Sequence, residues 1–336
     1  MYQQFYGLSA KPFQLRPDPN FFFGSKGHKR AASYLEYGLA QEEGFIVITG
    51  EIGAGKTTLL RNLFNKLKSK NIVAAQIVST HLDADDTLRM VAGAFGLPYD
   101  RDTKATLLNR IEQFLCACYR QNTRALLVVD EAQNLTPHSM EELRMLSNFQ
   151  TADKSLLQIF LLGQPEFRKT LLGEDMKQLQ QRVIATYHLG PMDVHETRSY
   201  IEHRLHTVGW RSDPRFSEAA FVAIYDFTGG IPRKINTLCD RLLLMGYLEE
   251  IHAFGKAEVD KVTSDIQQEF VLPAAEAKAE TLSSAAQAEL VVNSHVNQQN
   301  VDDRLSKMEQ SVTSILALLK QILSLSSIKN FPKDKG

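Results

Sequence analysis

A glycine-rich loop that contains one lysine and two threonines is the first candidate for chemistry in this sequence. Gly50, Gly55, Lys56 and Thr57 match the spacing G-x-x-x-x-G-K-[ST]. In such a loop the backbone N–H groups surround phosphates, the lysine reaches the β- and γ-phosphates, and the hydroxyl coordinates Mg²⁺. The alternative is an ordinary glycine turn between a strand and a helix. We predict that ATP and Mg²⁺ are the cofactors and that the nucleotide-binding residues are Gly50, Glu51, Ile52, Gly53, Ala54, Gly55, Lys56, Thr57 and Thr58.

Two acids follow an apolar run further along the chain. The run LLVV carries Asp130 and Glu131 to the end of a predicted strand. Asp130 can hold Mg²⁺ together with Thr57, and Glu131 can act as general base on an attacking water. The alternative is a pair of solvated surface acids. Because the phosphate loop lies upstream in the same chain, the pairing favours hydrolysis over binding alone.

The elements that must position these residues alternate between strand and helix. Short apolar runs such as GFIVITG and SLLQIFLLG predict buried strands, and stretches with apolar residues at helical spacing lie between them. This order predicts an α/β domain over 1–190, a parallel sheet with helices on both faces. From about Pro191 helical patterns follow one another without strands, so we expect an all-helical second domain over 191–271.

The C-terminal quarter has a different composition. Residues 272–297 are rich in Ala, Ser and Glu and predict a linker. We expect a coiled coil over 298–325 and a tail over 326–336; the alternative is one amphipathic helix folded back on the helical domain. The heptad seam consists of Val301, Leu305, Met308, Val312, Ile315, Leu319 and Ile322.

Composition limits the function classes. The net charge of −1 provides no global basic field for nucleic acid or anionic lipid. Cys116, Cys118 and Cys239 are too few for a disulfide framework and lack zinc-site spacing, which fits a reducing compartment. The N-terminus has no signal-peptide pattern, and no apolar run approaches the ~20 residues of a membrane span. We therefore expect a cytoplasmic protein without a membrane span.

Six motifs, taken together and in this order, resemble the AAA+ ATPases of the general secretion pathway protein A (ExeA) type. The similarity spans roughly residues 1–268 and is greatest to the subgroup associated with exosortase and exopolysaccharide systems of Gram-negative bacteria. The motifs are FYGLSAKPFQLRPDPNFFFGSKGHKRA, GEIGAGKTTLLRNL, VVDEAQNL, LLGQPEF, LQQRV and GGIPRKIN.

The resemblance implies roles for three further residues. Gln164 falls where a sensor-1 residue contacts the γ-phosphate or the attacking water; the alternative is a polar residue at a strand-to-loop turn. Arg182 matches an arginine finger that acts on a neighbouring subunit's ATP; the alternative is a surface arginine in a salt bridge. Arg233 matches sensor 2 on the helical lid, although the preceding Pro232 is also good helix-start chemistry.

The N-terminal segment carries a histidine and several aromatic residues. In the similar family this segment lies near the nucleotide base, so His28 is a weak candidate; the alternative is a structural histidine. Phe13 and the run 21–23 are expected in the core rather than on a base-stacking surface.

These patterns lead to one main interpretation and two alternatives. We expect an AAA+ ATPase that forms a homo-oligomer and couples its nucleotide state to an envelope polysaccharide, protein-sorting or secretion system, with a partner bound through the coiled coil. The membrane span and peptidoglycan-binding domain that follow the ATPase core in the secretion protein are not found in 269–336. One alternative is a DNA-binding transposition-type ATPase, which the lack of a basic recognition helix disfavours without excluding it. The other is a nucleotide-gated scaffold with negligible turnover.

Overall fold

A five-stranded parallel sheet forms the centre of the α/β domain. A computed structural model describes residues 1–269 except 17, 68–70, 80–82, 100–101 and 153, and Met1–Gln267 form one compact unit. The strand order is β2-β3-β4-β1-β5, and all four neighbouring pairs are parallel, as predicted. The strands are β1 (Phe45–Gly50), β2 (Ile72–Val78), β3 (Arg124–Asp130), β4 (Leu157–Gly163) and β5 (Val183–Leu189).

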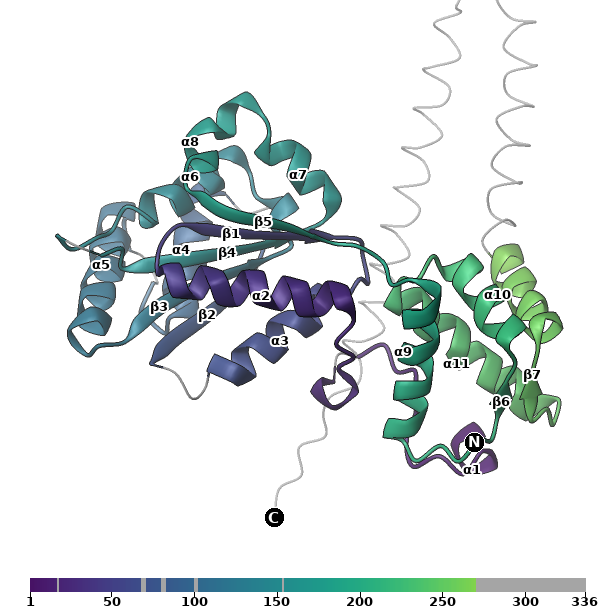
Figure 1. Ribbon diagram of the computed structural model, residues 1–336. Helices are drawn as coiled ribbons and strands as arrows, with labels where there is room; N and C mark the ends of the chain where they lie inside the picture. Colours follow the sequence, from purple (N-terminus) through teal and green to yellow (C-terminus); the bar gives the residue numbers. More distant parts are fainter. Residues whose placement is uncertain (17, 68–70, 80–82, 100–101, 153, 270–336) are drawn as a thin grey trace, which may run out of the picture. The chain divides into compact units, whose positions relative to one another are not determined.

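The central strands are apolar on both faces because helices cover both sides (Figure 1). Alternate residues of β1 enter different cores: Phe45 and Val47 belong to one hydrophobic cluster, whereas Ile46 and Ile48 belong to another. Helices α2 and α3 contribute to the second cluster, and α4 to α8 contribute to the first. These helices are α2 (Lys26–Gln41), α3 (Lys56–Leu67), α4 (Ala84–Ala94), α5 (Lys104–Arg120), α6 (Pro137–Leu146), α7 (Pro165–Leu171) and α8 (Lys177–Gln180).

The second region is built mainly from helices around a third hydrophobic cluster. A final helix begins at Lys256 and reaches the last described residue. The prediction of helices without strands missed one small feature, a parallel pair of two-residue strands. Segments this short carry no readable alternation, since the pattern needs four or more residues. The elements are α9 (Val194–Thr207), β6 (Arg215–Phe216), α10 (Glu218–Thr228), α11 (Pro232–Leu248) and β7 (Ala253–Phe254).

The N-terminal segment packs on this helical region. It contains α1 (Tyr2–Phe5) and a 3-10 turn, Pro19–Phe21. Tyr2 and Phe13 are buried in the same cluster as the lid helices, and Ser9 N–H donates to the Val208 carbonyl at 2.9 Å. The chain thus reaches the helical region first, enters the sheet through α2, and returns after β5.

The linker, coiled coil and tail predicted for 272–336 lie outside the described residues. Within the described part of the chain, none of the helices combines the length and apolar character needed to cross a membrane.

Candidate active site

The phosphate loop connects the carboxyl end of β1 to the start of α3. Gly53 (φ 83°) and Gly55 (φ 99°) adopt left-handed conformations that side chains with a Cβ rarely accept. In the described part of the chain, the first-turn N–H groups of Lys56, Thr57 and Thr58 donate to no other group. Unpaired donors at a helix start, with the positive end of the helix dipole, suit an anion. The loop therefore fits a phosphate.

Lys56 is held across this loop. Its side chain is buried, and Nζ donates to the Gly50 carbonyl at 2.6 Å and to the Glu51 carbonyl at 3.1 Å. Burial lowers the pKa of Lys56, and the charges of Glu131 and Asp130 oppose that shift. A buried ammonium whose hydrogen bonds go to neutral carbonyls can exchange them for phosphate oxygens.

Replacing Lys56 with alanine should weaken nucleotide binding. A charge-assisted hydrogen bond is worth about 1.5–3 kcal/mol, so we expect Lys56→Ala to raise the Kd for ADP and ATP about 10- to 100-fold. Titration calorimetry measures the change. Lys66→Ala, on the exposed last turn of the same helix, is the control and should leave the Kd unchanged. Wild-type affinity for Lys56→Ala would contradict the phosphate-loop assignment.

Asp130 and Thr57 form a pair of oxygen ligands beside the lysine. Asp130 is the last residue of β3 and is buried, and Thr57 Oγ1 donates to its Oδ2 at 3.3 Å. A hydroxyl and a carboxylate are ligands that Mg²⁺ accepts, and Mg²⁺ usually takes only one or two protein ligands beside substrate phosphates. The described residues contain no group of three or more His, Cys, Asp or Glu that could hold a metal alone. The donor set therefore fits Mg²⁺ that is bound together with a nucleotide.

Asp130 should reduce the stability of the nucleotide-free protein. Burial raises its pKa, and the hydrogen bond from Glu131 N–H and the charge of Lys56 oppose that effect only in part. Because the folded state disfavours the charged carboxylate, stability is lost as pH rises from the unfolded pKa through the folded one. We expect Asp130→Asn to have a higher Tm than wild type at pH 7. The difference should vanish near pH 3, where both states are protonated.

Thermal unfolding of the nucleotide-free protein at both pH values checks this expectation. Asp226→Asn, at an exposed position of α10, is the matched control and should leave Tm unchanged. A Tm for Asp130→Asn below that of wild type at pH 7 would show that the carboxylate stabilises the fold.

Glu131 occupies a left-handed backbone conformation (φ 55°), which is uncommon for a residue with a side chain and is often found at functional sites. Its Oε2 accepts from Gln133 Nε2 at 2.6 Å and from Gln164 Nε2 at 3.3 Å. Gln133 Oε1 also accepts from Gln164 N–H at 2.9 Å. Two amides therefore orient the carboxylate beside the phosphate loop. The sequence reasoning missed Gln133, although it stands in the same DEAQ run as the two acids.

Arg233 reaches the phosphate loop from the helical region. It is the second residue of α11, and its N–H donates to the Gly53 carbonyl at 3.2 Å. A Cβ at Gly53 would lie only 2.3 Å from Cβ of Arg233, so a glycine is required there for close approach. The structure thus brings Arg233 to the loop, as the resemblance implied.

A cavity of about 220 Å³ opens beside these residues. Lys56, Thr57, Glu131 and Arg233 line it, together with residues 14–16 and 21–23 of the N-terminal segment. The cavity therefore extends from the phosphate loop to the N-terminal segment.

His28 contacts the phosphate loop rather than standing free in solvent. Its Nδ1 lies 2.7 Å from Ser25 Oγ, and a Cβ at Gly55 would be 2.6 Å from its Nε2. Burial lowers the pKa of His28, while the charge of Glu196 and a hydrogen bond with the Ala54 backbone raise it. The lowered pKa favours the neutral ring, which packs against Gly55 and lines the same cavity as the loop.

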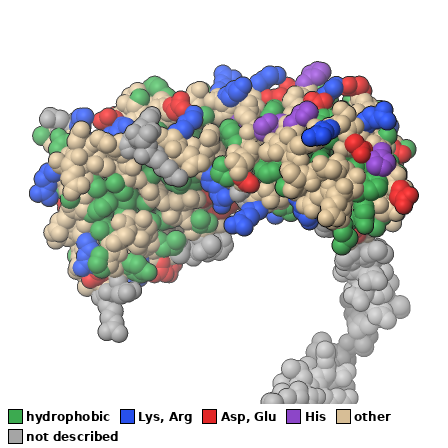
Figure 2. All heavy atoms as spheres, turned by 90° about the horizontal axis from the view of Figure 1, so that it is seen from below, with side chains coloured by type: hydrophobic (Ala, Val, Ile, Leu, Met, Phe, Trp, Pro, Cys, Tyr) green, Lys and Arg blue, Asp and Glu red, His purple; other side chains and the backbone are tan. Residues whose placement is uncertain are grey.

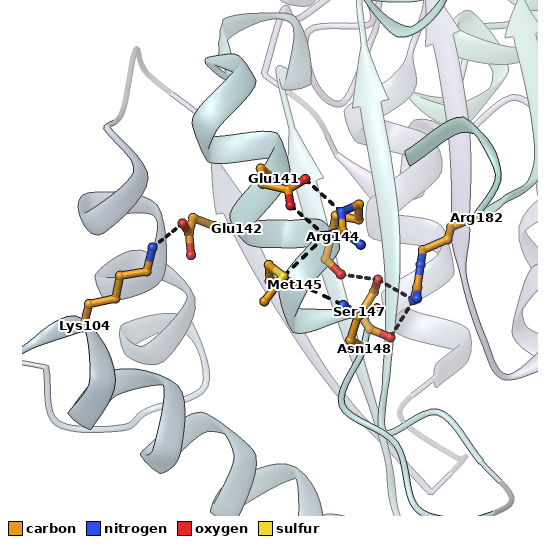
Figure 3. A network of polar contacts seen from close by, with 8 residues as sticks. All are labelled: Lys104, Glu141, Glu142, Arg144, Met145, Ser147, Asn148 and Arg182. Atoms are coloured by element: carbon orange, nitrogen blue, oxygen red, sulfur yellow. Dashed lines mark hydrogen bonds and ion pairs between the residues drawn. The ribbon is translucent and has the colours of Figure 1, made fainter. Parts of the chain in front are cut away.

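Arg182 lies far from its own phosphate loop. It immediately precedes β5, and its carbonyl accepts from Phe45 N–H at the start of β1. The phosphate loop begins at the other end of β1, at Gly50. Five residue steps of about 3.3 Å separate Phe45 from Gly50, so the backbone of Arg182 lies about 17 Å from its own loop. The guanidinium instead donates to the Ser147 carbonyl and to Ser147 Oγ, both at 3.2 Å (Figure 3). The structure does not bring Arg182 to the other candidate residues within one chain.

The parallel sheet, the phosphate loop after β1 and the acids at the end of β3 define a P-loop protein with the AAA fold. Residues 39–171 match the protein-family model described as "AAA domain". The chain is 37% identical over 267 residues to General secretion pathway protein A of Aeromonas hydrophila, which is 79% of this chain and 48% of that protein. The chain therefore spans about half the length of that curated relative.

Solved structures with little sequence similarity share the fold. The ORC2 protein of Aeropyrum pernix in its ADPNP–ADP complexes has a TM-score of 0.58 at 17% identity, covering 76% of this chain and 71% of that chain. Cdc6p of Pyrobaculum aerophilum has a TM-score of 0.58 at 17% identity, covering 74% and 70%. Both proteins confirm the arrangement of the sheet and its helices.

Proposed function

We propose that this protein is an ATPase of the general secretion pathway protein A type, which binds ATP with Mg²⁺ and hydrolyses it. One observation carries the proposal: Lys56, Thr57, Asp130 and Glu131 converge at the carboxyl ends of β1 and β3. The 37% identity to General secretion pathway protein A supports the family assignment. The narrower assignment to the exosortase- and exopolysaccharide-associated subgroup rests on the motif resemblance alone.

Each side chain has a separate task in this proposal. Lys56 and the N–H groups of the loop bind the β- and γ-phosphates, and Thr57 and Asp130 hold Mg²⁺, which supplies charge neutralisation on the phosphate oxygens. Glu131 accepts a proton from a water molecule. The oxygen of that water attacks the γ-phosphorus while the bond between this phosphorus and the leaving oxygen of ADP breaks. Gln164 orients Glu131 and the water, and Arg233 contacts the phosphates from the helical lid.

The position of Arg182 supports a site that is shared between two copies of the chain. A residue about 17 Å from its own loop cannot stabilise its own nucleotide, but it can reach the nucleotide of a neighbour in a homo-oligomer. Within the described residues, the guanidinium forms no ion pair with a carboxylate. A partly buried arginine with only neutral acceptors is suited to receive phosphate charge from a second copy.

The proposed output is assembly or regulation of a cytoplasmic-side component of an envelope polysaccharide, protein-sorting or secretion system. The name of the 37% identical relative and the motif resemblance support it. On the face drawn in Figure 2, Lys and Arg side chains are interspersed with Asp, Glu and apolar side chains. A mixed surface of this kind is unlike the continuous basic footprint expected of a DNA-binding face.

The direct test is phosphate release by the purified full chain in the presence of ATP, with Mg²⁺ and with an excess of chelator. We expect Mg²⁺-dependent release that Lys56→Ala abolishes. ATP binding without any Mg²⁺-dependent turnover would favour the nucleotide-gated scaffold instead. Filaments on DNA that form only with ATP and dissolve with salt would favour the transposition-type ATPase.

Removing residues after Val271 should leave the nucleotide site intact, because every candidate site residue lies upstream. We expect the shortened chain to bind ATP with wild-type affinity and to lose part of its self-association or its attachment to a partner. Val312→Asp together with Ile315→Asp should have the same effect, since charge would enter the predicted seam. Sedimentation and partner recovery measure both variants; unchanged values for both would exclude an assembly role for this segment.

A further inference from the structure

Arg204 is a buried arginine whose acceptors are all neutral. It lies on α9 with only 6% of its surface exposed. Its guanidinium donates to the Pro12 carbonyl at 2.6 Å, to Tyr200 Oη at 2.7 Å and to the Gln14 carbonyl at 3.3 Å. Among the described residues no carboxylate pairs with it, and the Phe21 ring lies 4.8 Å from the guanidinium carbon. A buried charge without a counter-charge is costly, so the hydrogen bonds of the guanidinium must offset its desolvation.

The contacts of Arg204 join two walls of the nucleotide cavity. Its carbonyl acceptors belong to the segment whose residues 14–16 and 21–23 line the cavity together with the phosphate loop, and Arg204 and Tyr200 also border this cavity. On the other side, Tyr200 Oη donates to Asn236 Oδ1 at 2.9 Å, and both residues are buried. Asn236 stands one helical turn after Arg233 on α11 and lines the same cavity. The guanidinium therefore links the N-terminal wall to the helix that touches the phosphate loop.

A nucleotide is longer than its phosphates. If the phosphates lie on residues 53–58, the nucleoside must extend to the remaining lining residues, which are those of the N-terminal segment and of α9 and α11. The wall that Arg204 holds in place is therefore the one that would contact the nucleoside, whereas the phosphate loop is carried by β1 and α3 and meets α11 at the contact between Arg233 and Gly53.

We propose that Arg204 is a positioning residue that, through Tyr200, fixes the N-terminal wall against α11 and thereby sets affinity for the nucleoside part of the nucleotide. This inference rests on the proposed nucleotide-binding function. It assigns to Arg204 an effect on nucleoside recognition that leaves phosphate recognition unchanged, and this separation can be measured.

The experiment compares ADP with inorganic pyrophosphate, each with Mg²⁺, in titrations of the full chain. Neither ligand is consumed by hydrolysis of a γ-phosphate. Arg204→Lys keeps the charge and loses the planar fork, and Tyr200→Phe keeps the ring and loses one hydroxyl. Loss of one hydrogen bond to a charged group corresponds to a change of about tenfold or more. We expect both variants to raise the Kd for ADP by about tenfold while the Kd for pyrophosphate stays within about twofold of wild type.

Arg198→Lys is the matched control, because Arg198 lies on the same helix but is only partly buried and is paired with Glu202 and Glu218. It should change neither Kd. Equal weakening of ADP and pyrophosphate, weakening of pyrophosphate alone, or no change in either would overturn the proposal. If wild type bound neither ligand, the proposed function itself would fail, which is a separate result. Tyr200→Phe removes a single oxygen from the core, so we expect it to fold and to test the proposal even if Arg204→Lys does not fold.

Discussion

Glu131→Gln should bind ATP as tightly as wild type and hydrolyse it about 10²- to 10⁴-fold more slowly, the usual contribution of a general base. The amide keeps the size of the side chain and one acceptor oxygen for Gln133, so the local geometry should persist. It cannot accept the proton of the attacking water. Asp130 and Thr57 remain, so Mg²⁺ binding should be retained. Nucleotide titration and single-turnover phosphate release measure the two effects separately.

Glu166→Gln is the control for this variant. Glu166 is exposed in the first turn of α7, and its charge raises the pKa of Lys56, but among the described residues no hydrogen bond joins its side chain to Glu131. Its removal changes the local charge by the same amount without removing a base, so its turnover should stay within a few-fold of wild type. Equal turnover for wild type and Glu131→Gln would remove Glu131 from the reaction.

Arg182→Ala should also bind ATP normally and lose most of its turnover. An arginine supplied by a neighbouring subunit contributes about 10³- to 10⁵-fold to phosphoryl transfer. Because the side chain is remote from its own loop, ATP affinity of the isolated chain should not change. The measurement is steady-state phosphate release at a protein concentration that supports oligomers, with ATP affinity measured in parallel.

The matched control is Arg144→Ala in the same polar network (Figure 3). Arg144 donates to Glu141 through two nitrogens, at 2.8 and 2.6 Å, so its charge is already neutralised. Its loss should have little effect on turnover. If Arg144→Ala and Arg182→Ala reduced turnover equally, both with lowered Tm, Arg182 would be a structural residue that holds the end of α6 through Ser147.

The sheet and its phosphate loop could be predicted because their signals are local. FIVITG and LLVV are buried runs that end at the functional residues, and the loop spacing is contiguous in the sequence. The strand order could not be read in this way, since β4 lies between β3 and β1 through packing of distant segments. The left-handed backbone conformation of Glu131 could not be predicted from the sequence either, because its usual signs are glycine or asparagine and position 131 holds neither.

The remaining parts of the site depend on contacts between distant segments. The carbonyls of Pro12 and Gln14 meet Arg204 across about two hundred residues, and no short motif records such a pairing. The side-chain amide of Gln133 donates to Glu131, and its oxygen accepts from the N–H of Gln164, which follows the end of a different strand, β4. The resemblance supplied Gln164 and Arg233; the structure places Gln164 beside Glu131 and Arg233 beside Gly53, and their catalytic roles stay predictions. The structure places Arg182 far from its own phosphate loop, and its role as an arginine finger stays a prediction.

Mixing two inactive variants tests the central claim, an ATP site completed by a second copy of the chain, most directly. Lys56→Ala lacks the loop lysine and keeps Arg182, whereas Arg182→Ala keeps the loop. We predict that mixtures hydrolyse ATP faster than the average of the two variants alone, with a maximum near equal amounts, because some interfaces then contain an intact loop and an intact arginine. Turnover that stays at the average at every ratio, while native mass spectrometry shows mixed oligomers, would contradict the account.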